Sequence, residues 1–300
     1  MATLETRPLG NTGLFATRIG FGALEIGRDW GLGTADARLR PDDEAAGEVL
    51  HGVLDLGVNL LDSARAYHRS EERIGKSVSA RRSEYILATK CGEHSNEPDT
   101  YYDFSYKGIS DSIDLSLRLL QTDVIDVLQI HFGPDPDKVL DEGETVRAMK
   151  DAKAAGKVRF LGASPGNGQL ERCIDCGDFD VLQVGYSLID RGAHNLITKA
   201  GDNGIGILIR SGLGAGWLTP RALTVAEDQR PEKVRKLLEL VGGDGEKLHQ
   251  LALAFLKAHS DITSILVGTK RVANLERNIA LFDTPTDPEL LERALVIVKG

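Results

Sequence analysis

Short apolar runs that alternate with longer amphipathic stretches constrain the fold of this chain more than any other feature of its sequence. Several of these runs are apolar on both faces, which is typical of parallel strands covered by helices. Room for an amphipathic helix follows each run. The runs predicted to be strands are residues 18–22, 58–62, 85–90, 124–131, 158–164, 181–186, 205–210 and 264–268. Eight strands, each with a helix after it, predict an α/β fold of the closed (β/α)8, or TIM, barrel type.

A doubly wound open sheet is the competing α/β architecture, and it usually begins with a Gly-rich phosphate turn between its first strand and first helix. Here the glycines of residues 20–33 follow the first strand, but no helical pattern begins before about Asp42. The segment GLGAGW at 212–217 does not fit the G-x-G-x-x-G spacing. A length of 300 residues suits one barrel. We therefore predict a single domain over residues 1–300.

Charge and composition exclude several classes of protein. The net charge is −9 and the chain has no basic block, which argues against a nucleic-acid partner. The apolar runs are too short to span a membrane, and the N-terminal segment has no apolar core of a signal peptide. Three cysteines in a chain of this length suggest a reducing compartment, so we expect a cytoplasmic protein. Cys173 and Cys176 are interpreted as small apolar residues of a helix, because no second ligand pair indicates a metal site.

Three consecutive predicted strands end in side chains that apolar runs normally exclude. Asp62 ends the second strand, Lys90 the third and His131 the fourth, while Tyr67 lies in the turn after Asp62. Taken singly, Asp62 could cap a helix and Lys90 could lie at the surface. His131 could equally be a core histidine, and Tyr67 a rim aromatic. In a (β/α)8 barrel, however, all these strand ends line the face where such barrels place their active sites.

A lysine beside a tyrosine suggests a specific chemistry. The phenol has an ordinary pKa near 10 and is a weak acid at pH 7. An ammonium at about 4 Å would favour the phenolate by up to roughly 4 kcal/mol at an effective dielectric of about 20, or about three pKa units. Asp62 would keep Lys90 charged, and His131 would donate to or orient a substrate oxygen. Such a set protonates a carbonyl oxygen, which requires a hydride source and so indicates a nicotinamide cofactor.

The motifs that contain these residues resemble those of the aldo-keto reductase family. The family pattern D-T-A-x-x-Y-G-x-S-E-x-x-[LI]-G is matched by DSARAYHRSEERIG at 62–75. Further matches follow in the same order: ILATKCG (86–92), DVLQIHF (126–132), GKVRFLGAS (156–164), LQVGYSLIDR (182–191) and SILVGTKRVANLERN (264–278). The resemblance implies the (β/α)8 fold and the reversible interconversion of carbonyls, including those of aldoses, and alcohols. It also implies that Tyr67 is the acid–base residue of a tetrad with Asp62, Lys90 and His131.

The same resemblance implies a cofactor site along the last strands. Ser164 and Gln183 would bind the nicotinamide carboxamide, residues 210–218 would cover the nicotinamide and pyrophosphate, and the segment from Gly268 would grip the adenosine end. Lys270 and Arg271 suit a 2′-phosphate, so we expect NADP(H), with NAD(H) as the alternative. Trp30 and Trp217 are candidate walls of the substrate pocket. The implied cofactor residues are Ser164, Gln183, Arg210, Ser211, Leu213, Gly214, Gly216, Gly268, Thr269, Lys270, Arg271, Asn274 and Asn278.

Three positions depart from the family pattern. His68 replaces the glycine after the tyrosine, Pro165 stands where many members have Asn, and Arg210 replaces an aromatic that often stacks on the nicotinamide. Arg210 and Pro165 motivate a second hypothesis, a cofactor-binding regulatory or redox-sensing barrel with little turnover. A third is a lyase or isomerase that uses Lys90 as a Schiff base.

Overall fold

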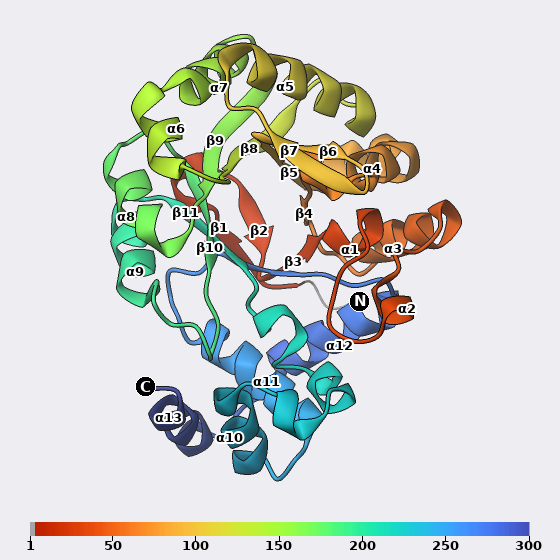
Figure 1. Cartoon of the computed structure of the whole chain (residues 1–300), viewed down its shortest axis with the longest axis vertical. Helices are drawn as coiled ribbons and strands as arrows, with labels where there is room; N and C mark the ends of the chain where they lie inside the picture. The colour runs from red at the N-terminus through yellow and green to blue at the C-terminus, as the bar shows by residue number, and fades with distance from the viewer. Residues whose placement is uncertain (1–3, 300) are drawn as a thin grey trace.

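The computed structural model of the protein describes residues 4–299 and contains a closed barrel of parallel strands (Figure 1). The last strand pairs with the first, so the barrel sheet closes on itself. The barrel strands are β3 (Ile19–Gly22), β4 (Leu60–Asp62), β5 (Ile86–Cys91), β8 (Ile125–His131), β9 (Val158–Ser164), β10 (Val181–Gly185), β11 (Gly206–Arg210) and β12 (Ser264–Val267). Each predicted run forms one of these strands, which confirms the (β/α)8 prediction.

A helix follows each barrel strand and packs on the outside of the sheet (Figure 1). These helices are α3 (Asp43–Asp55), α4 (Ser70–Val78), α5 (Tyr106–Leu120), α7 (Glu144–Ala154), α8 (Asn167–Asp175), α9 (His194–Asp202), α11 (Gly245–Lys257) and α12 (Val272–Asp283). Helix α3 begins directly after Asp42, where the first helical pattern was predicted, and buries Val49, Leu50 and Val53. Helix α5 begins at Tyr106, because Ser105 caps it by accepting from the Gly108 amide.

Two apolar cores explain why the strands are hydrophobic on both faces. Successive strand residues point to opposite faces of the sheet. Leu87 belongs to the large core between the sheet and the helices, whereas Ile86 and Ala88 belong to a smaller core inside the barrel. The hairpin of β1 (Thr6–Pro8) and β2 (Phe15–Thr17), with the turn η1 (Gly10–Thr12), adds Leu9 and Ala16 to this inner core. One end of the barrel is thereby filled with apolar side chains.

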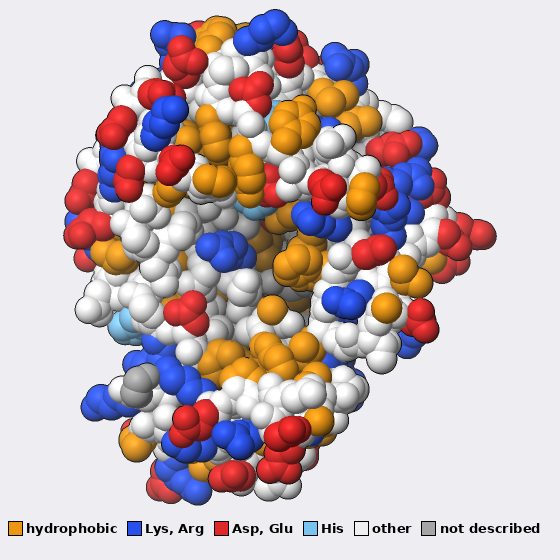
Figure 2. Space-filling model, in the orientation of Figure 1, with side chains coloured by type: hydrophobic (Ala, Val, Ile, Leu, Met, Phe, Trp, Pro, Cys, Tyr) orange, Lys and Arg blue, Asp and Glu red, His pale blue; other side chains and the backbone are white. Residues whose placement is uncertain are grey.

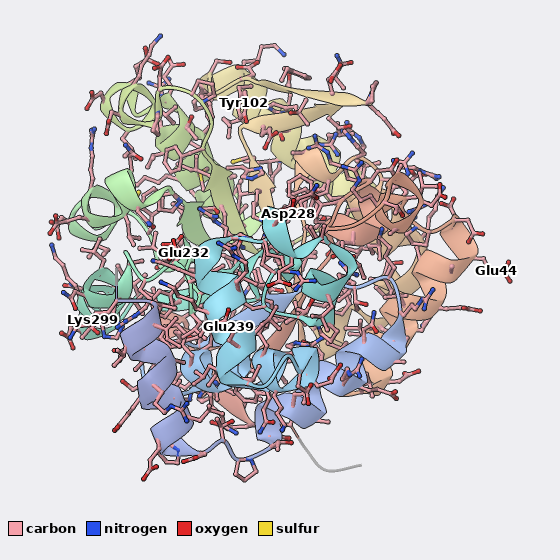
Figure 3. The ribbon with its side chains drawn as sticks, turned by 60° about the horizontal axis from the view of Figure 1, so that its bottom comes forward. Glu44, Tyr102, Asp228, Glu232, Glu239 and Lys299 are labelled. Carbon is pink, nitrogen blue, oxygen red and sulfur yellow. The ribbon has the colours of Figure 1, made fainter. Side chains whose placement is uncertain are left out.

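The remaining elements lie in loops or follow the last barrel helix. The first loop holds α1 (Leu24–Gly27) and α2 (Ala35–Arg38), and the third holds a hairpin of β6 (Glu93–Asn96) and β7 (Asp99–Tyr102). The seventh loop is the longest and includes helix α10 (Glu232–Leu240), which Figure 3 shows with Glu232 and Glu239 labelled. The others are η2 (Arg65–Tyr67), η3 (Ser79–Glu84), α6 (Pro136–Glu142), η4 (Gly214–Gly216), η5 (Pro220–Thr224), η6 (Glu227–Gln229) and α13 (Pro288–Ile297).

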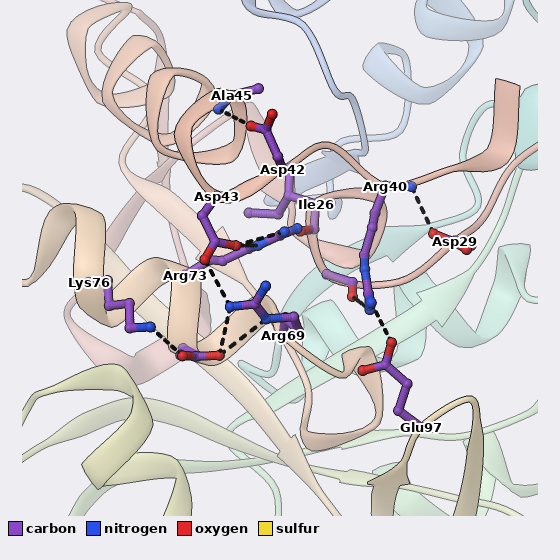
Figure 4. Close-up of polar contacts among 12 residues, drawn as sticks. Ile26, Asp29, Arg40, Asp42, Asp43, Ala45, Arg69, Arg73, Lys76 and Glu97 are labelled. Atoms are coloured by element: carbon purple, nitrogen blue, oxygen red, sulfur yellow. Dashed lines mark hydrogen bonds and ion pairs between the residues drawn. The ribbon is translucent and has the colours of Figure 1, made fainter. Parts of the chain in front are cut away.

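Ion pairs join α3 to the start of α4 and the first loop to the hairpin (Figure 4). Asp43 at the start of α3 accepts hydrogen bonds at 2.9 Å from both Arg69 and Arg73. Arg40 of the first loop pairs with Glu97, in the turn between β6 and β7. These contacts fix the loops around the mouth of the barrel to one another.

Within residues 4–299 no helix is long and apolar enough to cross a membrane. Cys173 lies buried in α8, as predicted, whereas Cys176 is the exposed C-cap residue that follows the helix. Residues 4–299 contain no cluster of His, Cys, Asp and Glu side chains that could hold a metal ion.

Candidate active site

The alternation that builds the inner core also places polar side chains above it. Asp62 lies two residues after Leu60, and Lys90 two residues after Ala88, so both polar side chains point into the barrel. Gln183 follows Val181 of the inner core in the same way. The inside of the barrel therefore changes from apolar to polar along its length. The polar layer lies at the carboxyl ends of the strands, where (β/α)8 barrels place their sites.

Lys90 is the centre of this polar layer and is 1% exposed. Its Nζ donates to Asp62 Oδ2 at 2.6 Å and to the Ser63 carbonyl at 2.8 Å. The same nitrogen lies 3.2 Å from the Tyr67 hydroxyl. The three residues singled out on β4, β5 and the intervening turn thus meet in one cluster.

Burial and charge act in opposite directions on the two proton-carrying groups. Burial raises the pKa of Tyr67, and the nearby positive charge of Lys90 offsets only part of this effect. Desolvation of the phenolate thus opposes the effect of the ammonium that the sequence predicted. Burial by itself would lower the pKa of Lys90, but Asp62 and Tyr67 outweigh it and raise that pKa. Lys90 is therefore a cation in the folded protein.

Two glutamines hold the other oxygen of Asp62. Gln129 and Gln183 donate to Asp62 Oδ1 at 2.9 Å and 2.8 Å. With Lys90 on Oδ2, the carboxylate is bound at both oxygens, which fixes its orientation. Gln183, implied to bind the cofactor carboxamide, therefore supports the Asp62–Lys90 pair in this structure. Gln129 was not singled out from the sequence, although its place two residues before His131 puts it on the inner face of β8.

His131 ends β8 beside the tyrosine. The two rings lie perpendicular with centroids 6.0 Å apart. His131 Nδ1 is 2.9 Å from Oε2 of Glu93 on β6, a carboxylate that the sequence analysis did not single out. Asp62, Lys90, Tyr67 and His131 are thus neighbours at one end of the barrel.

A cavity of about 340 Å³ extends from this cluster towards α12. Figure 2 shows the molecule hollowed on the face in view, with hydrophobic and basic side chains around the hollow. Its walls come from the first and seventh loops, from β12 and from α12. The predicted residues that line it are Trp30, Asp62, Tyr67, His131, Gln183, Arg210, Ser211, Leu213, Gly216, Gly268, Asn274 and Asn278.

Other implied cofactor and substrate residues do not line this cavity. Ser164 is buried at the end of β9, and Trp217 packs against the core. Thr269 accepts from the Arg271 amide and from Asn274, so it supports the start of α12. Lys270 donates to the carbonyls of Ala37 at 2.9 Å and Leu39 at 2.8 Å, which holds the first loop in place. Gly214 and Arg271 are also outside the lining.

Four charged or titratable side chains line the cavity without having been predicted. Glu25 of α1 pairs with Arg221 of η5 at 3.4 Å, across the first and seventh loops. His249 of α11 is 5% exposed and contacts Asn278 Oδ1 through Nε2 at 2.8 Å, while its buried Nδ1 has no hydrogen-bond partner among residues 4–299. Arg277 of α12 pairs with Glu246 and also reaches the cavity. Glu25, Arg221 and His249 lie outside the motifs that resemble the family. Arg277 lies within one of these motifs, at a position without an implied role. Only the folded structure therefore places these four side chains at the cavity.

The three departures from the family pattern have defined places. His68 adopts a φ of 50°, the left-handed region in which the glycine of the pattern would be unstrained. Its Nδ1 lies 2.7 Å from the Ser95 hydroxyl of β6. Arg210 donates to the Pro165 carbonyl at 3.1 Å and lines the cavity. The Pro165 and Arg210 positions are therefore in direct contact.

Comparison with known proteins places these features in a family. The sequence model described as the Aldo/keto reductase family matches residues 18–294. L-galactose dehydrogenase of Arabidopsis thaliana is 32% identical, over 93% of this chain and 88% of that protein. An NADH-specific methylglyoxal reductase of Escherichia coli is 26% identical, over 91% and 92%. The structure of the holo form of aldo-keto reductase AKR11C1 from Bacillus halodurans superposes with a TM-score of 0.80 at 27% identity, covering 98% of this chain and 96% of that one.

Proposed function

Because the chain belongs to the aldo/keto reductase family and is an NAD(P)H-dependent reductase, we propose that Tyr67 is its acid–base residue and NADP(H) its preferred cofactor. The observation that carries the proposal is the 3.2 Å contact between Lys90 Nζ and the Tyr67 hydroxyl. An amine that close, and itself held by a buried carboxylate, stabilises the phenolate left after proton transfer.

The cavity fits a nicotinamide dinucleotide in its chemistry. It joins the Tyr67 cluster to the amino end of α12, and the glycines Gly212, Gly216 and Gly268 let its walls approach a ligand closely. The buried Nδ1 of His249, at the α12 end, has no hydrogen-bond partner in the described part of the chain, so it offers an acceptor or donor to a ligand group. When bound, the cofactor would supply or accept the hydride.

We assign the proton steps to the residues of the cluster. In the reductive direction, Tyr67 gives its hydroxyl proton to the substrate oxygen, and Lys90 stabilises the phenolate that remains. Asp62, bound at both oxygens, keeps Lys90 charged and aimed at Tyr67. His131 lines the same cavity and holds the substrate oxygen through its free ring nitrogen. The buried position of the cluster strengthens each of these interactions, because water does not screen them.

The substrates we propose are aldehydes, ketones and aldoses with their alcohols. A relative named L-galactose dehydrogenase, similar over nearly its whole length, supports the sugars within this class. The preference for NADP(H) is supported by Arg221 and Arg277, which line the cavity. Lys270 is a weaker argument than the sequence suggested, because carbonyls of the first loop already bind its amine. NAD(H) is the alternative. The three free cysteines support a reducing, cytoplasmic location.

A carbonyl panel tests the proposal. Purified protein is mixed with NADPH or NADH and with aldehydes, ketones or aldoses, and nicotinamide absorbance is followed. We expect consumption of cofactor with at least one carbonyl class and a higher kcat/KM with NADPH. Binding of NADPH, seen by its fluorescence, without any consumption would instead favour the regulatory barrel, for which the unusual Arg210 is the motivating residue. Borohydride trapping of a substrate on Lys90 would favour the Schiff-base alternative.

A further inference from the structure

His249 brings a buried polar atom to the wall of the cavity that none of the assigned proton steps uses. It lies at the end of the cavity formed by η5, α11 and α12, where Arg221 and Arg277 are its basic neighbours. Its Nδ1 is buried and has no hydrogen-bond partner among residues 4–299. A buried polar atom without a partner costs free energy, which a ligand group bonded to it would recover.

Asn278 determines which nitrogen of this imidazole carries the proton. Helices α11 and α12 lie side by side (Figure 1), and His249 Nε2 is 2.8 Å from Asn278 Oδ1. The Asn278 amide is itself oriented, because its Nδ2 donates to the Asn274 carbonyl at 2.7 Å. The opposite orientation of the amide would bring two acceptor oxygens together. Since Oδ1 can only accept, Nε2 of His249 must donate and therefore carries the proton.

The imidazole is neutral in the folded protein, so its second nitrogen is an acceptor. Burial lowers the pKa of His249 to about 4, and the positive charge of Arg277 acts in the same direction. Arg277 is held close by Glu246, one turn before His249 in α11, at 2.6 Å. A neutral ring that is protonated at Nε2 presents a lone pair at Nδ1 and no hydrogen to donate there.

The same hydrogen bonds change the role that the family resemblance implies for two asparagines. Both polar ends of the Asn278 amide are bound within the chain, so this side chain supports His249. Asn274 Nδ2 likewise donates to Thr269 Oγ1 at 3.1 Å. His249, which the resemblance does not implicate, thus places an acceptor without a partner in the described chain beside residues that were expected to grip the adenosine.

We propose that His249 accepts, at Nδ1, a hydrogen bond from an N–H or O–H group at the adenosine end of the cofactor. The donor would be the 6-amino group of adenine or a ribose hydroxyl. This inference deepens the proposed function, on which it rests for the identity of the ligand. A phosphate oxygen has no hydrogen to donate and would face the lone pair of Nδ1. Phosphate groups would instead be bound by Arg221 or Arg277, which line the same cavity.

Two substitutions separate the roles of the two ring nitrogens. His249→Gln places an amide nitrogen near the position of Nε2, so it can keep the donor to Asn278 but has no acceptor at the position of Nδ1. His249→Asn is shorter, so its amide oxygen replaces Nδ1 while the contact with Asn278 is lost. The exposed His51→Gln of α3 is the matched control.

Equilibrium binding of two cofactors tests the contact. In deamino-NADPH, which contains hypoxanthine, a carbonyl oxygen replaces the adenine amine. If the amine is the donor, the wild type should bind NADPH about tenfold more tightly than deamino-NADPH. His249→Gln should lose this discrimination through an about tenfold weaker binding of NADPH, whereas His249→Asn should keep most of it. His51→Gln should bind both cofactors as the wild type does.

A ribose hydroxyl as the donor gives a different pattern. The wild type would then bind NADPH and deamino-NADPH alike, and His249→Gln would weaken both by about tenfold. His249→Asn should again retain most of the affinity. Values of Kd in His249→Gln within about twofold of wild type for both cofactors would overturn the inference.

Nitrogen nuclear magnetic resonance of imidazole-labelled protein gives a second reading that needs no turnover. We expect Nε2 of His249 to be protonated and Nδ1 unprotonated before the cofactor is added. On binding NADPH, the Nδ1 resonance should move as for an accepted hydrogen bond, with no proton on this atom. A proton on Nδ1 in the complex would indicate a phosphate at this position and would overturn the inference. A resonance that NADPH leaves unchanged would do so too, even if His249→Gln does not fold.

These readings separate this inference from the proposed function. A protein that binds NADPH with the expected discrimination but reduces no carbonyl would contradict only the proposed activity. A protein that reduces carbonyls while His249→Gln binds NADPH and deamino-NADPH as the wild type does would contradict only the role of His249. Absence of any cofactor binding would contradict both.

Discussion

At the scale of single residues, Arg210 carries a positive charge into the wall of the cavity. Within residues 4–299 it has no acidic side chain within 4 Å, and burial lowers its pKa. A fixed cation there disfavours the positively charged oxidised nicotinamide. We expect Arg210→Gln to lower the ratio of the Kd for NADP⁺ to the Kd for NADPH by about tenfold. Isothermal titration of both forms measures the ratio, with the exposed Arg147→Gln as control. An unchanged ratio would show that the charge of Arg210 does not affect the relative affinities for NADP⁺ and NADPH.

His249 links the cavity to the pH dependence of stability. Burial lowers the pKa of His249 to about 4, below its ordinary value near 6.5. Between these values the unfolded chain binds a proton that the folded protein does not. The free energy of unfolding should therefore fall as the pH drops from about 6.5 to about 4, by up to ~1.4 kcal/mol per unit. Urea denaturation should show this slope reduced in His249→Gln but kept in the exposed His51→Gln. If the free energy of unfolding had the same slope against pH in the wild type, His249→Gln and His51→Gln, the lowered pKa of His249 would be contradicted.

The residues of the site that the sequence could indicate are those that end apolar strands. Asp62, Lys90 and His131 are conspicuous because such runs rarely end in charged groups. Glu93 and His249 could not be found in this way. One lies in a polar hairpin and the other in a helix, and each gains its meaning from a partner far along the chain. The role of Gln129 was not predicted, because a single glutamine in an apolar strand has many structural explanations.

At the scale of elements, the close approach of α1 to η2 positions the tyrosine. A Cβ at Gly27 would lie 2.2 Å from the Tyr67 carbonyl. Gly27→Ala should therefore displace the Tyr67 turn, cost about 1–3 kcal/mol of stability and reduce kcat. Gly168→Ala in α8 is the matched control, because a Cβ there meets nothing within 4 Å. It should be neutral or stabilise by up to about 1 kcal/mol. Thermal unfolding and turnover of both variants check this, and a neutral Gly27→Ala would refute the packing argument.

The barrel strands were predictable because each is apolar, short and separated from the next by a helix-length stretch. The hairpin β6–β7 was not predicted. Its strands, EHSN and DTYY, have no apolar face, since one side contacts polar loops and the other is largely exposed. Loop elements of this kind are set by tertiary contacts such as Arg40 with Glu97, which no local pattern records.

At the scale of the whole molecule, the cavity joins strands from both ends of the chain to the first and seventh loops. A ligand that fills it should stabilise the entire fold, because it binds only the closed barrel. NADPH at about 100 times its Kd should add ~2.7 kcal/mol to the free energy of unfolding, which raises the Tm by several degrees. Calorimetry with and without NADPH measures the shift. No shift at saturating NADPH would contradict a cofactor site in this cavity.

The count and order of the strands were enough to predict closure, because parallel strands with a helix after each leave few alternatives. The final pairing of β12 with β3 follows from that count. What the pattern could not give is how the seventh loop folds over the cavity. Its turns have positive φ at Ser211 and Ala215, and neither position is a glycine that would indicate this conformation in the sequence.

The most direct test of the central claim is the rate of hydride transfer in Tyr67→Phe, measured in a single turnover with NADPH and a carbonyl that the wild type reduces. Removal of the one hydroxyl that Lys90 contacts should slow this step by at least about 10²- to 10⁴-fold and leave the Kd for NADPH unchanged. Tyr101→Phe, at a tyrosine that is 52% exposed, should keep the wild-type rate. A Tyr67→Phe rate within a few fold of wild type would show that another group protonates the substrate.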